Sequence, residues 1–448
     1  MLTVLLPVLV LFAIILLPLP KIGGDVRIGL LSAAVLAFLL GQVGVSPAVV
    51  AAIDGIDRIA WVIGLSIFGS IYAQTQIRLG TMDTVLNTFR ALFGRSPRGL
   101  ITAVVLSLVL AGSLLGDAIA TTTVIGVLVV MSLAELGLDG EQVGLTLLLG
   151  GILGSIMPPI TQSFFLAASL VDTPVDPVIS IGYITVGIGV MVALATVWRY
   201  VHIKELPPEL IPIRSAGQIL AREWPRLVPL VVLGAIVILR SGFKIEVLEV
   251  LDPLLPLGDV PILKALTNRI IQAIIITTVL TMAFPQVRRE LRGILIDGIK
   301  AVSKTVQIQF CAGIMLGAFY ASGMIDQVVA FTQGLTPAAT TLGGAVAVLL
   351  IGMLTGSQST AQNTLLPFLG PMLTQNFGVS ATKAALGAGH LAMAGQSMPP
   401  VCLTTFVVAG VVGGILAKKV DPVRIMIMAL PVTLYFTAVG LAAWFQLF

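Results

Sequence analysis

The chain has 448 residues, of which 57% are hydrophobic and only 10% are charged. A soluble domain carries about 25% charged residues, and no soluble fold of this length could bury so much apolar surface. The composition therefore excludes an ordinary soluble protein and indicates that the chain's surroundings are a lipid bilayer. The formal net charge of +4, without a basic run, gives no sign of nucleic-acid binding.

Apolar runs of membrane-spanning length recur from one end of the sequence to the other. A transmembrane helix needs roughly 20 apolar residues. The first run lacks the basic leading region and the cleavage site of a signal peptide, so we interpret it as a true span. The sequence thus predicts an all-α integral membrane protein with about ten full spans, near residues 2–20, 28–46, 59–77, 142–171, 178–198, 227–241, 266–284, 302–322, 382–413 and 425–447.

Two further stretches, 99–135 and 337–376, are too long for one span and carry a polar, glycine-containing interruption. Each is predicted to be a re-entrant helical hairpin that enters and leaves on the same side. Under that topology 19 of the 25 Lys and Arg residues lie on one side of the membrane. The positive-inside rule makes this side cytoplasmic and places both termini outside.

The topology also predicts how the chain is divided. Residues 1–203 would form a first repeat, with leading helices and an inward-opening hairpin at 99–135. Residues 204–226 would be a cytoplasmic connecting segment. Residues 227–448 would form a second repeat, with an outward-opening hairpin at 337–376.

Four sequence landmarks recur in the two halves at nearly constant offsets. Interrupted segments at corresponding places of two inverted halves are typical of a transporter's binding site at the membrane midplane. The sequence therefore predicts two inverted repeats, each with one hairpin and one broken transmembrane helix. The landmarks are Met157-Pro158-Pro159 and Met398-Pro399-Pro400 (241 positions apart), Val175-Asp176-Pro177 and Val420-Asp421-Pro422 (245), Gly112-Ser113 and Gly356-Ser357 (244), and Gly69 to Tyr72 and Gly317 to Tyr320 (248).

The two hairpin tips and the two helix breaks are predicted to meet and to form the site. Half-helix N-termini attract anions, and freed carbonyl groups can bind Na⁺. A single polar, glycine-containing patch in a membrane helix usually serves helix packing. Two patches at corresponding places of the two repeats favour a binding site. The expected helix-breaking residues are Pro158, Pro159, Pro399 and Pro400. The expected substrate-binding residues are Ser113, Gly116, Thr121, Ser155, Thr161, Gln162, Ser359, Thr360, Asn363, Gln396 and Ser397. The expected ion-coupling residues are Asp117, Gly151, Gly154, Thr355, Gly356, Ser357 and Gly395. We expect no cofactor and no metal other than Na⁺, with Na⁺ or H⁺ as the coupling ion.

Two ionisable residues within the predicted spans each have two interpretations. Asp117 is the only acid expected deep in the membrane, and such a group is a functional hypothesis by default. It could bind Na⁺ or take up a coupling proton, or it could cap the hairpin tip, and the sequence leaves both open. His390 could sense protons, but we favour an interhelical hydrogen bond. Cys311 and Cys402 lie in apolar runs and are expected to pack there.

These motifs resemble the large membrane subunit of the tripartite ATP-independent periplasmic (TRAP) transporters, within the ion transporter superfamily. In that family a Gly/Ser hairpin tip precedes a Gly-Gly…Pro-Pro break, as Gly116-Asp117 and Gly150-Gly151…Pro158-Pro159 do here. The second half matches at Pro367, Pro371, Pro399-Pro400-Val401 and Ala409-Gly410, and the likeness covers about residues 55–445. At the first tip the family usually carries Ser-Gly-Ser, where this chain has Leu115-Gly116-Asp117.

The resemblance implies cation-coupled uptake of a small organic acid across the cytoplasmic (inner) membrane by a multi-pass protein. It also implies two partners, a small membrane subunit and a periplasmic solute-binding protein. The runner-up is a stand-alone proton symporter similar to the gluconate permeases. An intramembrane aspartyl protease would need a second membrane-embedded acid, and none is available, so we expect no enzyme. A channel fits paired hairpins less well than a carrier does. The sequence leaves the substrate, the coupling ion and the oligomeric state open.

Overall fold

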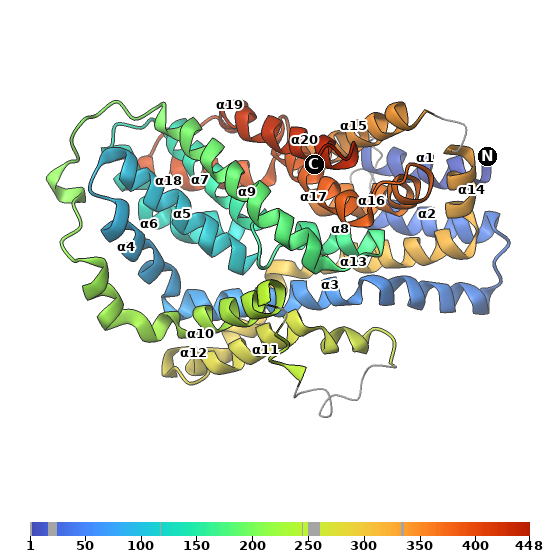
Figure 1. The fold of residues 1–448 in the computed structure, drawn as a ribbon, viewed down its shortest axis with the longest axis horizontal. Coiled ribbons are helices and arrows are strands. Elements are labelled where there is room, and N and C mark those ends of the chain that lie inside the picture. Colours follow the sequence, from blue (N-terminus) through green and yellow to red (C-terminus); the bar gives the residue numbers. More distant parts are fainter. Residues whose placement is uncertain (1, 17–24, 117, 244, 250–259, 333–335) are drawn as a thin grey trace.

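The computed structural model describes residues 2–16, 25–116, 118–243, 245–249, 260–332 and 336–448, and these form helices and connecting segments with no strand (Figure 1). Five of the described helices are long and apolar enough to cross a membrane, and a sixth span is a pair of helices bent by 53°. Further apolar helices of 10–17 residues accompany them. The predicted all-α membrane fold is confirmed.

One group of helices, here called the framework, is built on the two longest helices, α3 (Val45–Leu79) and α13 (Leu291–Ala321), which run side by side (Figure 1). Its other members are α1 (Leu2–Leu16), α2 (Val26–Leu40), α10 (Ala216–Phe243), α11 (Arg269–Thr281) and α12 (Pro285–Arg289). Glycines let α3 and α13 approach closely. A Cβ added at Gly55 would lie 2.1 Å from the carbonyl oxygen of Gly313, and one at Gly317 would lie 1.9 Å from that of Ala51.

Helix α3 starts earlier than the predicted span 59–77, because the charges near its start find partners. Asp57 forms an ion pair with Lys264, and its carboxylate accepts the backbone N–H of Ile262 at 2.7 Å. The Arg58 guanidinium lies 4.4 Å from the ring centre of Tyr320. These contacts let charged residues continue a helix that hydropathy alone would have ended.

The second group, here called the hairpin group, holds both predicted hairpins. The first is α5 (Pro97–Leu115) with α6 (Ala118–Glu135), and the second is α15 (Pro337–Thr355) with α16 (Gln358–Pro371), which ends in a π-helical turn, Met372–Asn376. Each first arm stops at a glycine with positive φ, Gly116 at 68° and Gly356 at 62°, a conformation that other residues adopt only at a cost. The boundaries agree closely with the predicted 99–135 and 337–376.

The two predicted broken helices complete the hairpin group. The first is α7 (Gly140–Ile156) with α8 (Gln162–Val171), and the second is α17 (Ala381–Ser397) with α18 (Leu403–Leu416). Both breaks contain a cis Pro-Pro bond, Pro158-Pro159 and Pro399-Pro400. Helices α9 (Val175–Trp198), α19 (Pro422–Met428) and α20 (Leu430–Trp444) pack against them. All four prolines therefore lie where the sequence placed the helix breaks.

Several short elements connect these groups. Helix α4 (Thr81–Phe93) packs against both α5 and α10, in the stretch between the predicted span 59–77 and the predicted hairpin 99–135. The others are α14 (Met324–Thr332) and two 3₁₀ turns, Pro208–Leu210 and Leu263–Thr267. Since α10 begins at Ala216, the predicted connecting segment 204–226 is partly helical. The division into repeats at this segment stays a prediction.

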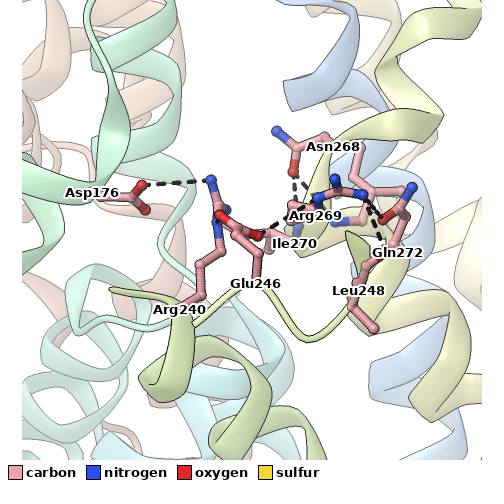
Figure 2. Close-up of polar contacts among 9 residues, drawn as sticks. Asp176, Arg240, Glu246, Leu248, Asn268, Arg269, Ile270 and Gln272 are labelled. Atoms are coloured by element: carbon pink, nitrogen blue, oxygen red, sulfur yellow. Dashed lines mark hydrogen bonds and ion pairs between the residues drawn. The ribbon is translucent and has the colours of Figure 1, made fainter. Parts of the chain in front are cut away.

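An ion-pair network joins the hairpin group to the framework (Figure 2). Arg240 on α10 lies 3.5 Å from the carboxylate of Asp176 on α9 and 3.2 Å from that of Glu246. The other oxygen of Glu246 lies 3.6 Å from Arg269 on α11. Arg269 also donates to the carbonyl oxygen of Leu248 at 3.2 Å. The network therefore links α9, α10, α11 and the segment that precedes α11.

The close crossing of α3 and α13 gives a stability prediction. Gly317→Ala forces a methyl group against the Ala51 carbonyl, so we expect a loss of about 1–3 kcal/mol in the free energy of unfolding. Gly69→Ala on the same pair of helices is the matched control, because no heavy atom lies within 4 Å of the added Cβ. Thermal unfolding of purified protein in detergent measures both variants. Equal melting temperatures for the two would contradict the close crossing.

Candidate functional site

The first hairpin tip rests on the first helix break at very short range. A Cβ on Gly112 would lie 2.6 Å from the Cα of Gly154, and one on Gly116 would lie 3.5 Å from the carbonyl oxygen of Ile160. The backbone N–H of Ile160 donates to the carbonyl oxygen of Ser113 at 3.0 Å. The break therefore supplies a partner for a carbonyl that the end of α5 leaves free.

The second tip rests on the second break in the corresponding way. A Cβ on Gly352 would lie 3.0 Å from the Cα of Gly395, and one on Gly356 would lie 3.0 Å from the carbonyl oxygen of Val401. Gly116 therefore corresponds to Gly356, 240 positions later, which is close to the 241 of the Pro-Pro pairs. The sequence comparison paired Gly112 with Gly356, which is one helical turn too early.

A cavity of about 140 Å³ lies between the two tips. It brings together seven of the residues predicted for the site, from both hairpins and both breaks: Gly116, Ser155, Gln162, Gly356, Ser357, Ser359 and Gln396. The remaining lining residues are Ala118, Ile119, Thr305, Gln358, Leu403 and Thr404. No charged side chain is among these described lining residues.

The first residues of four helices line this cavity. They are Ala118 of α6, Gln162 of α8, Gln358 of α16 and Leu403 of α18. The first turn of a helix carries backbone N–H groups without intrahelical partners and the positive end of the helix dipole. Four such ends offer backbone N–H groups to an anion without any basic side chain, and the C-terminal ends of α5, α7, α15 and α17 line the same cavity and offer carbonyl oxygens to a cation.

Hydrogen bonds hold the second tip and the wall opposite it. Gln396 accepts the backbone N–H of Gln358 at 2.9 Å, which fixes the start of α16 to the end of α17. The hydroxyl of Ser357 lies 3.1 Å from that of Ser359. On the other side, Gln162 donates to Ser66 on α3 at 3.2 Å, so the site also contacts the framework.

A second cavity, of about 540 Å³, continues from the first along α3 and α13. The two share Gly116, Ile119, Gln162 and Thr305. The larger cavity reaches Arg78, which is paired with Glu290 at 3.2 Å and with Asp297 at 3.3 Å. The cavity therefore extends from the hairpin tips to Arg78, a residue that the sequence predicts to lie on the cytoplasmic side.

Other predicted site residues lie outside the tip cavity and support its walls. Thr161 caps α8, and the hydroxyls of Ser113, Thr355 and Ser397 donate to carbonyl groups of their own helices. Thr360 donates to Ser357 at 3.1 Å, and Thr121 is buried in α6. The glycines at 151, 154 and 395 permit close packing, since an added Cβ would lie 2.3–2.6 Å from a neighbouring atom. Asp117 falls outside the described residues.

Asn363 is fully buried, and neither its side-chain oxygen nor its nitrogen has a protein partner. Beside it, Gln362 donates to Ser163 on α8 at 3.0 Å, while its oxygen is also unpartnered. Buried polar groups are nearly always hydrogen-bonded. Two neighbouring side chains of α16 are therefore buried with polar atoms that no described protein group satisfies.

His390 lies near this buried region, with its ring centre 5.2 Å from that of Phe164 and 5.5 Å from that of Phe436. Its Nδ1 lies 2.9 Å from the carbonyl oxygen of Leu386, one turn earlier on α17. This bond is within one helix and Nε2 has no partner among the described residues, so the expected interhelical hydrogen bond is wrong, and His390 lines neither cavity.

Thr305 and Thr404 were missed by sequence reasoning, and Gln358 belonged to the predicted second tip without being among the expected binding residues. Gln358 and Thr404 follow directly after a tip and a break, so the first turn after each interruption was a usable signal. Thr305 comes from the middle of α13, in the framework, and only the packing of the two helix groups brings it to the site.

Comparisons with known proteins agree with this arrangement. Residues 8–446 match the family model described as "Tripartite ATP-independent periplasmic transporter, DctM component". The chain belongs to this family. It is therefore a TRAP-type secondary transporter component and not an enzyme, and it is a multi-pass membrane protein. The search of curated proteins gave no match.

Two solved structures show the same fold at low sequence identity. The Alcanivorax borkumensis transporter YdaH, described as having an unusual topology, matches with a TM-score of 0.62 at 14% identity, over 89% of this chain and 86% of its own. Neisseria gonorrhoeae MtrF, from a class described as antimetabolite efflux pumps, matches with a TM-score of 0.60 at 14% identity, over 99% and 92%. At such identity the likeness concerns the fold alone.

Proposed function

We propose that this DctM-family chain takes up a small organic acid, held by its carboxylate in the cavity between the two hairpin tips. The observation that carries the proposal is the convergence of four helix N-termini on that cavity. Because no basic side chain is among the described lining residues, backbone N–H groups and neutral side chains such as Ser359 and Gln162 would hold the anion.

The coupling ion in this proposal is Na⁺. The arms that end at the tips and breaks leave backbone carbonyl oxygens, and Ser155, Ser357 and Gln396 add neutral oxygens. Na⁺ prefers oxygen ligands of this kind, and none of the three side chains titrates near neutral pH. Coupling to H⁺ through Asp117 is the alternative, and it corresponds to the stand-alone symporter.

Transport would proceed by movement of the hairpin group against the framework. The larger cavity lies between them, lined by α3 and α13 on one side and by the first hairpin on the other. Gln162 and Ser66, which bond across this boundary, would separate when the groups move. A small membrane subunit and a periplasmic solute-binding protein would complete the transporter in the inner membrane.

The first test is uptake into liposomes that contain the purified chain, with a panel of labelled carboxylates under an imposed Na⁺ or H⁺ gradient. We expect no uptake until the co-encoded binding protein and small subunit are added, and a requirement for Na⁺ after that. Uptake by the chain alone would contradict the tripartite assignment and favour a stand-alone symporter. The absence of carboxylate uptake by the complete system would contradict the substrate class.

Ser359→Asp tests the anion site directly. An added carboxylate in the first turn of α16 would repel an anionic substrate and compete with it for backbone N–H groups, so we expect a loss of uptake of at least tenfold. Ser359→Asn introduces a side chain of nearly the same size as Asp but without the charge, so this variant should keep most of the uptake activity. Both variants must elute as folded protein. Equal activity of the two would show that the cavity does not bind an anion.

Asp117→Asn separates the two coupling ions. If Asp117 only caps the hairpin tip, the variant keeps the wild-type dependence of uptake on Na⁺ and on pH, and this is the result we expect with Na⁺ bound by neutral oxygens. Uptake rates at several Na⁺ concentrations and pH values measure the dependence. A variant that loses its response to the H⁺ gradient would assign proton coupling to Asp117.

A further inference from the structure

A pocket of about 440 Å³ lies away from the transport cavities, where the start of α10 faces the turn between α11 and α12. Three arginines dominate its lining, Arg214, Arg222 and Arg226. The remaining lining residues are Glu223, Pro225, Phe284 and Gln286. All three arginines belong to the side with most of the Lys and Arg, so the pocket opens toward the cytoplasmic leaflet.

Neighbouring elements fix the wall of this pocket. Thr84 on α4 donates to the Glu223 carboxylate at 2.7 Å, and Thr81 donates to the carbonyl oxygen of Arg226 at 2.9 Å. Arg226 lies 3.3 Å from the same carboxylate. The single acid of the lining is therefore already engaged, and α4 holds the turn that carries two of the arginines.

The other two arginines are uncompensated. Arg214 and Arg222 are exposed, and neither has an ion pair within the described part of the chain, whereas Arg226 has Glu223. Three arginines against one glutamate leave two positive charges facing one pocket. A guanidinium group presents a planar fork of donors that matches phosphate oxygens, so the chemistry of the pocket suits a phosphate group.

Apolar side chains beside the pocket indicate where that phosphate comes from. Trp224, two residues from Arg222, lies at nearly the same depth on the other side of α10 and is 59% exposed, and Val231 and Ile238 continue the face of Trp224 at 62% and 50% exposed. On α11, Val279 is 63% exposed. An exposed tryptophan at the end of an apolar helical face is typical of the membrane interface. The arginines of α10 thus lie at headgroup level, and the exposed Val279 of α11 offers apolar surface to an acyl chain.

We propose that this pocket binds the phosphate of an anionic phospholipid of the cytoplasmic leaflet, with Arg214 and Arg222 as the phosphate ligands. Basic pockets between transmembrane helices on this side of a membrane bind acidic headgroups. The lipid would fasten α10 to α12 within the framework. The proposal concerns the framework alone, so its test needs no transport activity and is independent of the proposed substrate.

The test is a titration of the purified full chain, in neutral detergent, with phosphatidylglycerol, phosphatidylcholine or inorganic phosphate. Thermal unfolding gives the half-saturating concentration, and native mass spectrometry counts bound lipids. We expect saturable stabilisation by phosphatidylglycerol alone. Arg214→Gln with Arg222→Gln should raise the half-saturating concentration about tenfold or more. Stabilisation by inorganic phosphate alone would make the ligand a soluble phosphate and overturn the lipid assignment.

Arg95→Gln with Arg98→Gln is the matched control, because these exposed arginines lie on the same side, outside the pocket, and the change in net charge is equal. The control pair should bind phosphatidylglycerol as the wild type does. Equally weakened phosphatidylglycerol binding in the two double variants would show that the attraction is unspecific and would contradict a lipid site in this pocket. If the double variant fails to fold, Arg222→Lys is the substitute, because it keeps the charge without the planar fork of donors. We expect this variant to bind phosphatidylglycerol several-fold more weakly than the wild type does. Binding equal to that of the wild type would contradict the contact between Arg222 and the phosphate.

Discussion

A helix that stops inside a bilayer leaves backbone N–H and C=O groups that no water can reach, and the architecture of this protein follows from how those groups are satisfied. The first arm of each hairpin ends against the break of a broken helix, and the residues of that break pack in turn against the hairpin tip. The bond from Ile160 to the carbonyl of Ser113 and the bond from Gln358 to Gln396 show the exchange directly. The cavity between the tips is lined by the ends of the helices that take part in this exchange.

Such an arrangement needs backbones that approach one another more closely than side chains permit. Gly112 against Gly154 and Gly352 against Gly395 supply this in the two halves. The polarity of the site comes from these helix ends together with neutral side chains such as Gln162, Ser359 and Gln396. An anion held this way is surrounded by fixed dipoles that need little rearrangement when it binds, which suits a site that must also release its ligand.

Much of the hairpin group could be predicted from the sequence, because its signals are local. Glycine and proline interruptions at 116, 158–159, 356 and 399–400 mark the ends of helices, and the structure places helix ends there. Helix α4 was missed because its amphipathic pattern is too polar for a span. Thr305 was missed because nothing in the sequence around it records that α13 faces the tips. Contacts between distant segments set both features, and one sequence without relatives does not report such contacts.

The salt bridge between Asp176 and Arg240 joins helices of the two groups near the surface, with the carboxylate 40% and the guanidinium 22% exposed (Figure 2). Any sliding of one group past the other exchanges this contact for hydration by water and counterions. Dissolved salt screens partly exposed pairs, and the Debye length falls from about 10 Å at 0.1 M to about 3 Å at 1 M. In the proposed movement, the ionic strength around this pair would set part of the balance between the two arrangements, so the surrounding medium would tune the carrier without touching its binding site.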